Sequence, residues 1–193
     1  MYPRPDTREK QKVTITHAEQ GSGAQFDASG RYRYLLWRTV SARRAGAVLW
    51  IMLNPSTADA ERNDPTIRRV LGLSRRWRVG TVEVVNLFAF RATTPAELKR
   101  AAEPVGPHND TAIDEALARA EKVVCAWGAE PFAQQRAAAV VERIRRAGHV
   151  AACFGHTASG APRHPLYLPQ RSRLRPFRLG GERVLLEPHC RTT

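Results

Sequence analysis

Polar residues that could bind a ligand come directly after an apolar run of the sequence. Residues 47–53 (AVLWIML) end in the turn Asn54-Pro55-Ser56-Thr57. An Asn amide can both donate and accept hydrogen bonds, while the hydroxyl and N–H groups of Ser56 and Thr57 can hold a water or a phosphate. The alternative is a plain Asx-Pro turn that binds nothing.

A second polar residue interrupts another apolar run. Asn86 lies within residues 81–90 (TVEVVNLFAF), followed by Phe88. A buried amide must find partners, so Asn86 either bonds the backbone of its neighbours or reads the edge of a ligand. Nucleobases present donors and acceptors side by side and therefore suit an amide. We expect Asn86 and Phe88 to contact such a ligand, with a purely structural Asn86 as the alternative.

Two histidines lie near the end of the chain, His156 and His164, the second within GAPRHPLYLP. A neutral imidazole on such a loop could donate a hydrogen bond to a developing anion. The alternative is a solvated side chain without a role. The two histidines do not form a zinc-binding spacing with each other or with Cys153, so we expect no zinc.

The acidic residues and cysteines give weaker evidence for a functional site. Asp59 could activate a water, and together with Glu61 and Asp64 it could form an acidic metal site, but Asp64 fits better as a helix N-cap. The chain has three cysteines without CxxC spacing, which indicates neither a disulfide framework nor an iron–sulfur cluster. No GxGxxG, Walker or GxSxG motif occurs. We therefore expect no metal and no organic cofactor.

The elements that must position these residues alternate along the chain. Apolar runs at 47–53, 81–90, 122–127 and 149–154 predict four buried strands. Helical patterns cover 66–78 and 131–147. A short helix opens at 94–97, and Asn109 or Asp110 caps another helix that runs to about residue 120. The alternation predicts a three-layer α/β/α sandwich with a central, mostly parallel four-stranded sheet. Ligands bind beyond the carboxyl ends of such strands, where Asn54, Asn86 and His164 would lie.

Other segments have weaker patterns. Residues 13–15 and 32–37 predict short strands, 27–30 predicts a turn, and 178–186 predicts a hairpin. We expect an N-terminal extension at 1–25 that is partly disordered, and one domain at 26–193. No run of about 18 apolar residues and no secretory signal is present, so a cytoplasmic monomer is expected.

The charge of the chain favours a polyanionic partner. It has 31 Lys and Arg against 18 Asp and Glu, a net charge of +13, and most of the basic residues are Arg. Arg binds phosphate oxygens in bidentate fashion, which indicates contact with nucleic acid. A GC-rich genome would favour Arg codons without any such contact.

Two resemblances follow from these motifs. The segments MLNPSTADAERNDPTIRR, VVNLFAFRAT, VGPHND, AWG and GAPRHPLYL resemble a bacterial and phage family of uncharacterised domains over roughly residues 26–169. More remotely, the order of strand ends resembles the uracil-DNA glycosylase superfamily. Met52-Leu53-Asn54-Pro55-Ser56 matches its Gly-x-Asn-Pro-Gly motif at Asn and Pro, and His164-Pro165-Leu166 matches its His-Pro-Ser motif at His and Pro.

The second resemblance implies a function in DNA repair by base flipping. Asn54 would position the attacking water, with Asp59 as a substitute. Asn86 would read the base, and His164 would stabilise the departing base anion, with His156 as a rival. DNA phosphates would be bound by four arginines: Arg163, Arg171, Arg173 and Arg175.

Both glycines and the serine of those motifs are replaced here, and the aromatic residue that stacks on the base has no clear counterpart. We therefore expect a glycosylase-like enzyme acting on uracil or a modified base in single- or double-stranded DNA. The alternatives are an enzyme on a free nucleotide, a nucleoside or a hypermodified base, and a non-catalytic nucleic-acid-binding domain of the same fold.

Overall fold

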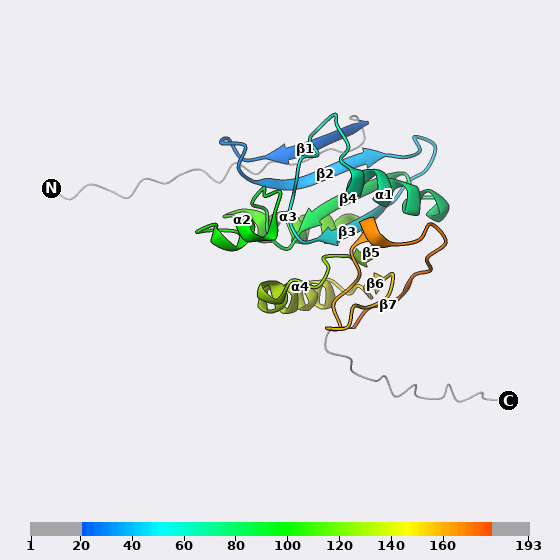
Figure 1. Cartoon of the computed structure of the whole chain (residues 1–193). Coiled ribbons are helices and arrows are strands. Elements are labelled where there is room, and N and C mark those ends of the chain that lie inside the picture. The colour runs from blue at the N-terminus through cyan, green and yellow to red at the C-terminus, as the bar shows by residue number, and fades with distance from the viewer. Residues whose placement is uncertain (1–20, 179–193) are drawn as a thin grey trace.

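The computed structural model describes residues 21–178, which form one mixed sheet with helices on both faces (Figure 1). The sheet has seven strands in the order β1-β2-β4-β3-β5-β6-β7. Strands β4, β3, β5 and β6 are mutually parallel, while β1, β2 and β7 pair antiparallel at the two edges. The strands are β1 (Ser22–Phe26), β2 (Arg33–Thr39), β3 (Ala47–Met52), β4 (Thr81–Asn86), β5 (Ala120–Cys125), β6 (Ala152–Cys153) and β7 (Arg175–Pro176).

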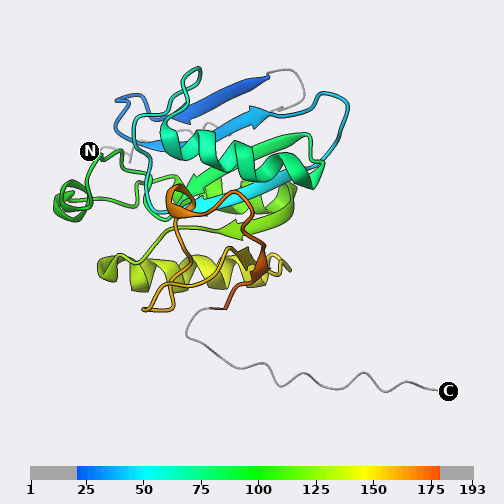
Figure 2. The same cartoon turned by 45° about the vertical axis from the view of Figure 1, so that its right-hand side comes forward.

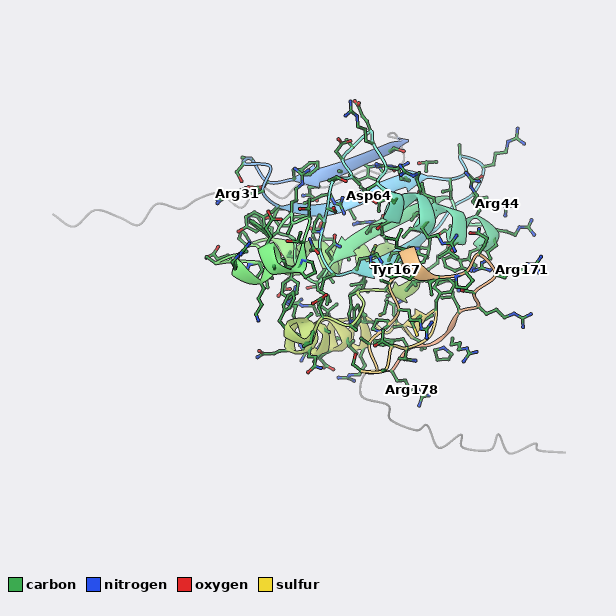
Figure 3. All side chains as sticks on the ribbon, in the orientation of Figure 1. Arg31, Arg44, Asp64, Tyr167, Arg171 and Arg178 are labelled. Atoms are coloured by element: carbon green, nitrogen blue, oxygen red, sulfur yellow. The ribbon has the colours of Figure 1, made fainter. Side chains whose placement is uncertain are left out.

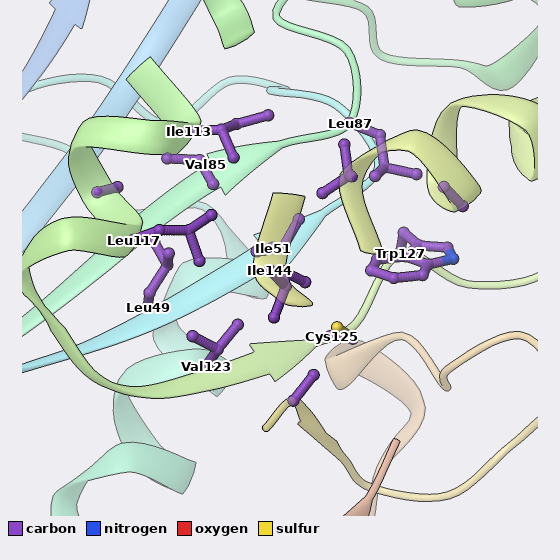
Figure 4. Close-up of a cluster of buried hydrophobic side chains, with 14 of the residues drawn as sticks. Leu49, Ile51, Val85, Leu87, Ile113, Leu117, Val123, Cys125, Trp127 and Ile144 are labelled. Carbon is purple, nitrogen blue, oxygen red and sulfur yellow. The ribbon is translucent and has the colours of Figure 1, made fainter. Parts of the chain in front are cut away.

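The helices divide between the two faces. One face is covered by α2 (Pro95–Arg100), α3 (Asn109–Arg119) and α4 (Gln134–Arg146), whose apolar side chains form a core with Leu49, Ile51 and Val85 (Figure 4). The other face is covered by α1 (Pro65–Ser74) and by the segment after β6 (Figure 2). Short 3-10 helices occur at η1 (Arg75–Trp77), η2 (Pro131–Ala133) and η3 (Pro165–Tyr167). Among residues 21–178, no helix combines the length and the apolar character needed to cross a bilayer.

The central strand β3 shows why this sheet is buried on both sides. All six of its residues are buried; Leu49 and Ile51 face the α3 layer, and Val48 and Trp50 face the α1 layer. A strand covered on both faces has no polar side, which explains its continuous apolar sequence. The indole Nε1 of Trp50 donates to Ser74 Oγ at 3.0 Å, which ties α1 to the sheet.

The predicted parallel strands and most helix starts are confirmed. Asp64 caps α1 through a 2.7 Å bond from Ile67 N, and Thr94 caps α2 through a 3.2 Å bond from Glu97 N. The predicted N-cap of α3, Asn109 or Asp110, is wrong, because His108 is the N-cap and Asn109 is the first helical residue. The fourth parallel strand is shorter than predicted, since β6 has only two residues.

The prediction of four strands is wrong, because the sheet has seven. Antiparallel strands extend the parallel core at both edges. β1 and β7 have weak sequence patterns and are positioned by pairing with β2 and β6. The predicted strand at 13–15 lies outside the described residues, as does the predicted hairpin beyond residue 178.

Candidate functional site

A cavity of about 130 Å³ opens at the carboxyl ends of β3 and β4, on the face that carries α1. It brings together Asn54, Asn86 and His164, which come from three separate segments of the chain. The remaining lining residues are Arg33, Met52, Leu53, Ser56, Asp64, Thr66, Ile67, Ala92 and Thr93. Eight of these twelve lining residues are polar or charged, so the cavity places several hydrogen-bonding groups close together, as ligand sites do.

Asn54 is fixed at the cavity by its amide nitrogen. Asn54 Nδ2 donates to Pro55 O at 2.9 Å and to Ala92 O at 2.8 Å, and Ala92 N in turn donates to Pro55 O at 3.0 Å. These bonds join the turn after β3 to the segment after β4. Both donors of the amide are thereby used, so only Oδ1 is left to accept a hydrogen bond from a ligand or a water.

Asn86 ends β4 and lies opposite Met52 in the register of the two parallel strands. Its side chain is only 1% exposed and follows Val84 on the face of α1. Asn86 Oδ1 accepts a long 3.5 Å contact from Arg33 Nη2, while Nδ2 has no partner among the described residues. The backbone is held by Asn109 Nδ2, which donates to Asn86 O and Leu87 O at 3.0 Å each. Asn86 thus presents a free donor from a rigid strand end.

His164 reaches the cavity because the loop after β6 folds back over the sheet. Gly128 N donates to Pro162 O at 2.9 Å, and Arg163 N donates to Gly155 O at 3.0 Å. The segment that follows His164 then docks on α1, where Arg69 Nη1 donates to Gln170 Oε1 at 2.6 Å. These contacts are distant in the sequence, and they set the position of the imidazole.

The imidazole of His164 is held in one tautomer. Nδ1 accepts from Leu166 N at 3.4 Å, so in the neutral ring the proton lies on Nε2. Burial lowers the pKa of His164, and Asp64 opposes this effect by favouring the charged form. His164 is therefore a neutral hydrogen-bond donor at neutral pH.

This lowered pKa makes stability depend on pH. The unfolded chain binds a proton on His164 more readily than the folded protein does, so stability decreases as the pH falls from above 6.5 through the lower folded pKa. We expect His164→Gln to reduce the loss of thermal stability between pH 7.5 and pH 5.5. Differential scanning calorimetry at both pH values measures this effect. An identical pH dependence in the variant would contradict it.

Arg33 is a cavity residue that the sequence analysis missed. Arg33 is 2% exposed, and β1 pairs with β2 through Gln25–Leu35 and then Phe26–Arg33, which makes Tyr34 the extra residue of a β-bulge. Leu35 and Trp37 face the α3 layer, so strict alternation would place Arg33 there as well. The bulge instead turns Arg33 to the α1 face, as bulges near functional sites often do. The direction of Arg33 therefore depends on the pairing of β1 with β2, which is not local in the sequence.

A groove adjoins the cavity and shares Ser56, Ala92 and Thr93 with it. It has a volume of about 400 Å³, and Thr57, Arg31 and Arg91 are also among its lining residues. The guanidinium of Arg91 lies over the Phe26 ring at 5.1 Å and donates to Gly30 O at 3.0 Å. A ligand held in the cavity can therefore extend into a groove that carries two arginines.

Neither the cavity nor the groove is lined by Asp59, Phe88 or His156. Asp59 Oδ1 accepts from Glu61 N at 2.9 Å and from Arg62 N at 2.7 Å, and these backbone bonds lower the pKa of Asp59. Its carboxylate therefore shapes a loop instead of facing the cavity. Phe88 packs against Phe132 in the core at 5.7 Å. His156 stacks on Phe177 at 5.7 Å, which leaves His164 as the cavity histidine.

The predicted turn residues divide between the cavity and its neighbourhood. Ser56 lines both the cavity and the groove, Thr57 lines the groove alone, and Pro55 is buried beneath them. The four predicted DNA-binding arginines are exposed on the segment after β6: Arg163, Arg171, Arg173 and Arg175. Figure 3 shows Arg171 pointing outward, on the same side of the sheet as Asp64 and Tyr167.

A second, larger cavity of about 330 Å³ lies near the carboxyl end of β5, lined by Trp127, Pro131 and Gln134 among others. It is mostly apolar and contains none of the predicted site residues. Within residues 21–178, no group of three or more His, Cys, Asp or Glu side chains is suited to hold a metal ion. Cys125 and Cys153 are free and buried, and burial raises the pKa of both thiols.

A search of the curated proteins finds no match, and neither does a search of the solved structures. One family model matches residues 33–166, a range that begins at the buried arginine of the cavity and ends just after its histidine. The chain belongs to the family described as "Protein of unknown function (DUF1643)".

Proposed function

We propose that this protein is a DNA glycosylase-like enzyme that hydrolyses the N-glycosidic bond of a flipped-out uracil or modified base. The observation that carries the proposal is the shared cavity of Asn54, Asn86 and His164. Its 130 Å³ is below the roughly 300–1,000 Å³ of typical small-molecule sites. The cavity therefore suits a single planar ring, with the attached sugar and phosphates outside.

Each of the three residues offers the group that such a reaction needs. Asn86 Nδ2 would donate to a carbonyl oxygen of the base. As the glycosidic bond breaks, its electron pair stays on the base, and His164 Nε2–H would donate to the resulting anion. One well-aimed donor of this kind contributes about 3–4 kcal/mol to the transition state.

Asn54 would act on the other reactant, the attacking water. Its free Oδ1 can accept a hydrogen bond from that water and aim the oxygen at the sugar carbon, where the new C–O bond forms. The proton lost by the water passes to solvent, and the departing base takes one up. This scheme uses only side chains that the cavity brings together.

The surroundings of the cavity support a polynucleotide substrate. Leu166 and Tyr167, immediately after His164-Pro165, are 43% and 80% exposed. Apolar and aromatic side chains in such positions insert between bases or stack on them when a nucleotide is flipped. Arg163 and Arg171 lie in the same segment and are exposed, as phosphate contacts require.

An oligonucleotide assay tests the proposal. Single- and double-stranded DNA containing uracil, hypoxanthine or a modified base is incubated with the protein, and abasic sites are detected by alkaline cleavage. We expect abasic product from at least one of these bases. Salt-sensitive DNA binding without product would support a non-catalytic binding domain instead. Base release from free nucleosides without DNA binding would support the alternative small-molecule enzyme.

A further inference from the structure

Two buried arginines of β2 differ in how their guanidinium groups are satisfied. Arg38, 4% exposed, donates to five acceptors: Gly23 O at 3.2 Å, Trp37 O at 2.8 Å, Asp59 O at 2.6 Å, Arg62 O at 3.4 Å and Asn63 Oδ1 at 2.8 Å. Every nitrogen of Arg38 therefore has a partner, and its charge is spread over a loop of carbonyl groups. This is the arrangement expected of a structural buried arginine.

Arg33 lacks such an arrangement. Its guanidinium makes two contacts, Nη1 to Ala58 O at 2.9 Å and Nη2 to Asn86 Oδ1 at 3.5 Å, and Nε is buried without a partner. No carboxylate within residues 21–178 forms an ion pair with it. The nearby Asp64 raises the pKa of Arg33 through its charge but makes no hydrogen bond to it, and Asp64 Oδ1 accepts from Ile67 N instead. Burying a charge without a partner is costly, so such groups are normally paired.

The position of Arg33 indicates what the missing partner is. Arg33 lines the same cavity as Asn86 and His164, and all three are hydrogen-bond donors there. Asp64 is the only carboxylate among the residues that line this cavity, and its Oδ1 already accepts from Ile67 N. Three donors beside a single acidic side chain favour a ligand that is rich in acceptors or negatively charged. Burial lowers the pKa of Arg33 to about 10, so its side chain still carries a positive charge at neutral pH.

We propose that the cavity binds its planar ligand as an anion and that Arg33 binds the negative charge. This inference rests on the proposed function, in which the base leaves as an anion. It adds that the cavity prefers a ring that is already negatively charged before any reaction takes place. Arg33, which belongs to none of the sequence motifs, provides this preference. In the reaction, Arg33 would stabilise the charge that develops on the departing base.

The test compares two rings of the same shape. Uracil is neutral at pH 7, whereas barbiturate is a similar six-membered ring that carries a negative charge. Isothermal titration calorimetry with the full chain should show barbiturate binding at least about tenfold more tightly than uracil, since hydrogen bonds to charged groups are the stronger ones. Arg33→Met should abolish the preference, and Arg33→Lys, which keeps the charge, should retain part of it.

Two variants serve as controls. Arg44→Met removes an exposed positive charge between β2 and β3 and should leave the preference unchanged. Arg38→Met should lower the thermal midpoint because it removes the hydrogen bonds to five acceptors, whereas Arg33→Met should not lower it. If Arg33→Met is as destabilising as Arg38→Met, Arg33 is structural and the inference fails.

The remaining outcomes separate this inference from the proposed function. Equal affinity for both rings, no binding of either, or Arg33-dependent binding of inorganic phosphate alone would overturn the inference. Abasic product at an unchanged rate in Arg33→Met would also overturn it, while leaving the glycosylase proposal intact. Arg33-dependent barbiturate binding without any abasic product would support the inference and contradict the glycosylase proposal.

Discussion

Asn54→Ala is expected to reduce base excision by about 100-fold or more, while DNA affinity stays within about tenfold of the wild type. The reason is that Oδ1 is the acceptor left to aim the water, whereas the contacts proposed for DNA phosphates lie on other segments. Single-turnover cleavage measures the first effect, and fluorescence anisotropy with labelled DNA measures the second. A cleavage rate within a few-fold of the wild type would remove Asn54 from the mechanism.

A matched variant separates catalysis from support of the turn. Asn54→Asp keeps an oxygen acceptor but loses the donors to Pro55 O and Ala92 O, so it should disturb the turn at least as much as alanine does. We expect Asn54→Asp to be no more stable than Asn54→Ala and yet more active. If the less stable of the two variants is also the less active one, Asn54 only stabilises the turn and has no role in catalysis.

Asn86→Asp should have two opposite effects, on stability and on ligand choice. The new carboxylate would lie beside Arg33, which has no anionic partner in the wild type, so the thermal midpoint should rise by about 2–4 °C for each kcal/mol gained. At the same time the donor Nδ2 is lost and the charge of Arg33 is neutralised. Excision of uracil should fall by about tenfold or more, with a shift towards bases that carry an amino group.

Asn109→Asp is the control for this prediction. Asn109 is an equally buried amide beside Asn86, but its Nδ2 bonds go to the backbone carbonyls of Asn86 and Leu87. We expect this substitution to lower stability and to leave the choice of base unaltered. If Asn86→Asp and Asn109→Asp behave alike on a panel of bases, Asn86 is structural.

The sequence predicts the parallel core of the fold well, because local patterns determine it. Residues 47–53 are apolar throughout and residues 81–90 are mostly apolar. Asp64-Pro65 marks the start of α1 with a cap that the structure confirms. Since adjacent parallel strands end at the same edge, the convergence of Asn54 and Asn86 on one cavity also follows from the sequence. The cavity confirms that these two residues lie together.

Other parts of the site depend on contacts that local patterns do not contain. His164 and His156 are equivalent candidates in the sequence, and only the return of the 155–164 loop over Gly128 places His164 at the cavity. Arg33 belongs to a strand whose alternation is broken by a bulge, so its direction is set by β1. The sequence suggests Asp59 as a carboxylate that could activate a water, but its Oδ1 accepts hydrogen bonds from backbone N–H groups of its own loop.

The central claim is that Asn54, Asn86 and His164 surround one planar guest, and a crystal structure of the protein soaked with uracil or barbiturate tests it most directly. We predict ring density inside the 130 Å³ cavity, with Asn86 Nδ2 and His164 Nε2 within hydrogen-bonding distance of the ring. A ring bound instead in the larger cavity near Trp127, or a polar cavity still empty at saturating ligand, would contradict the account.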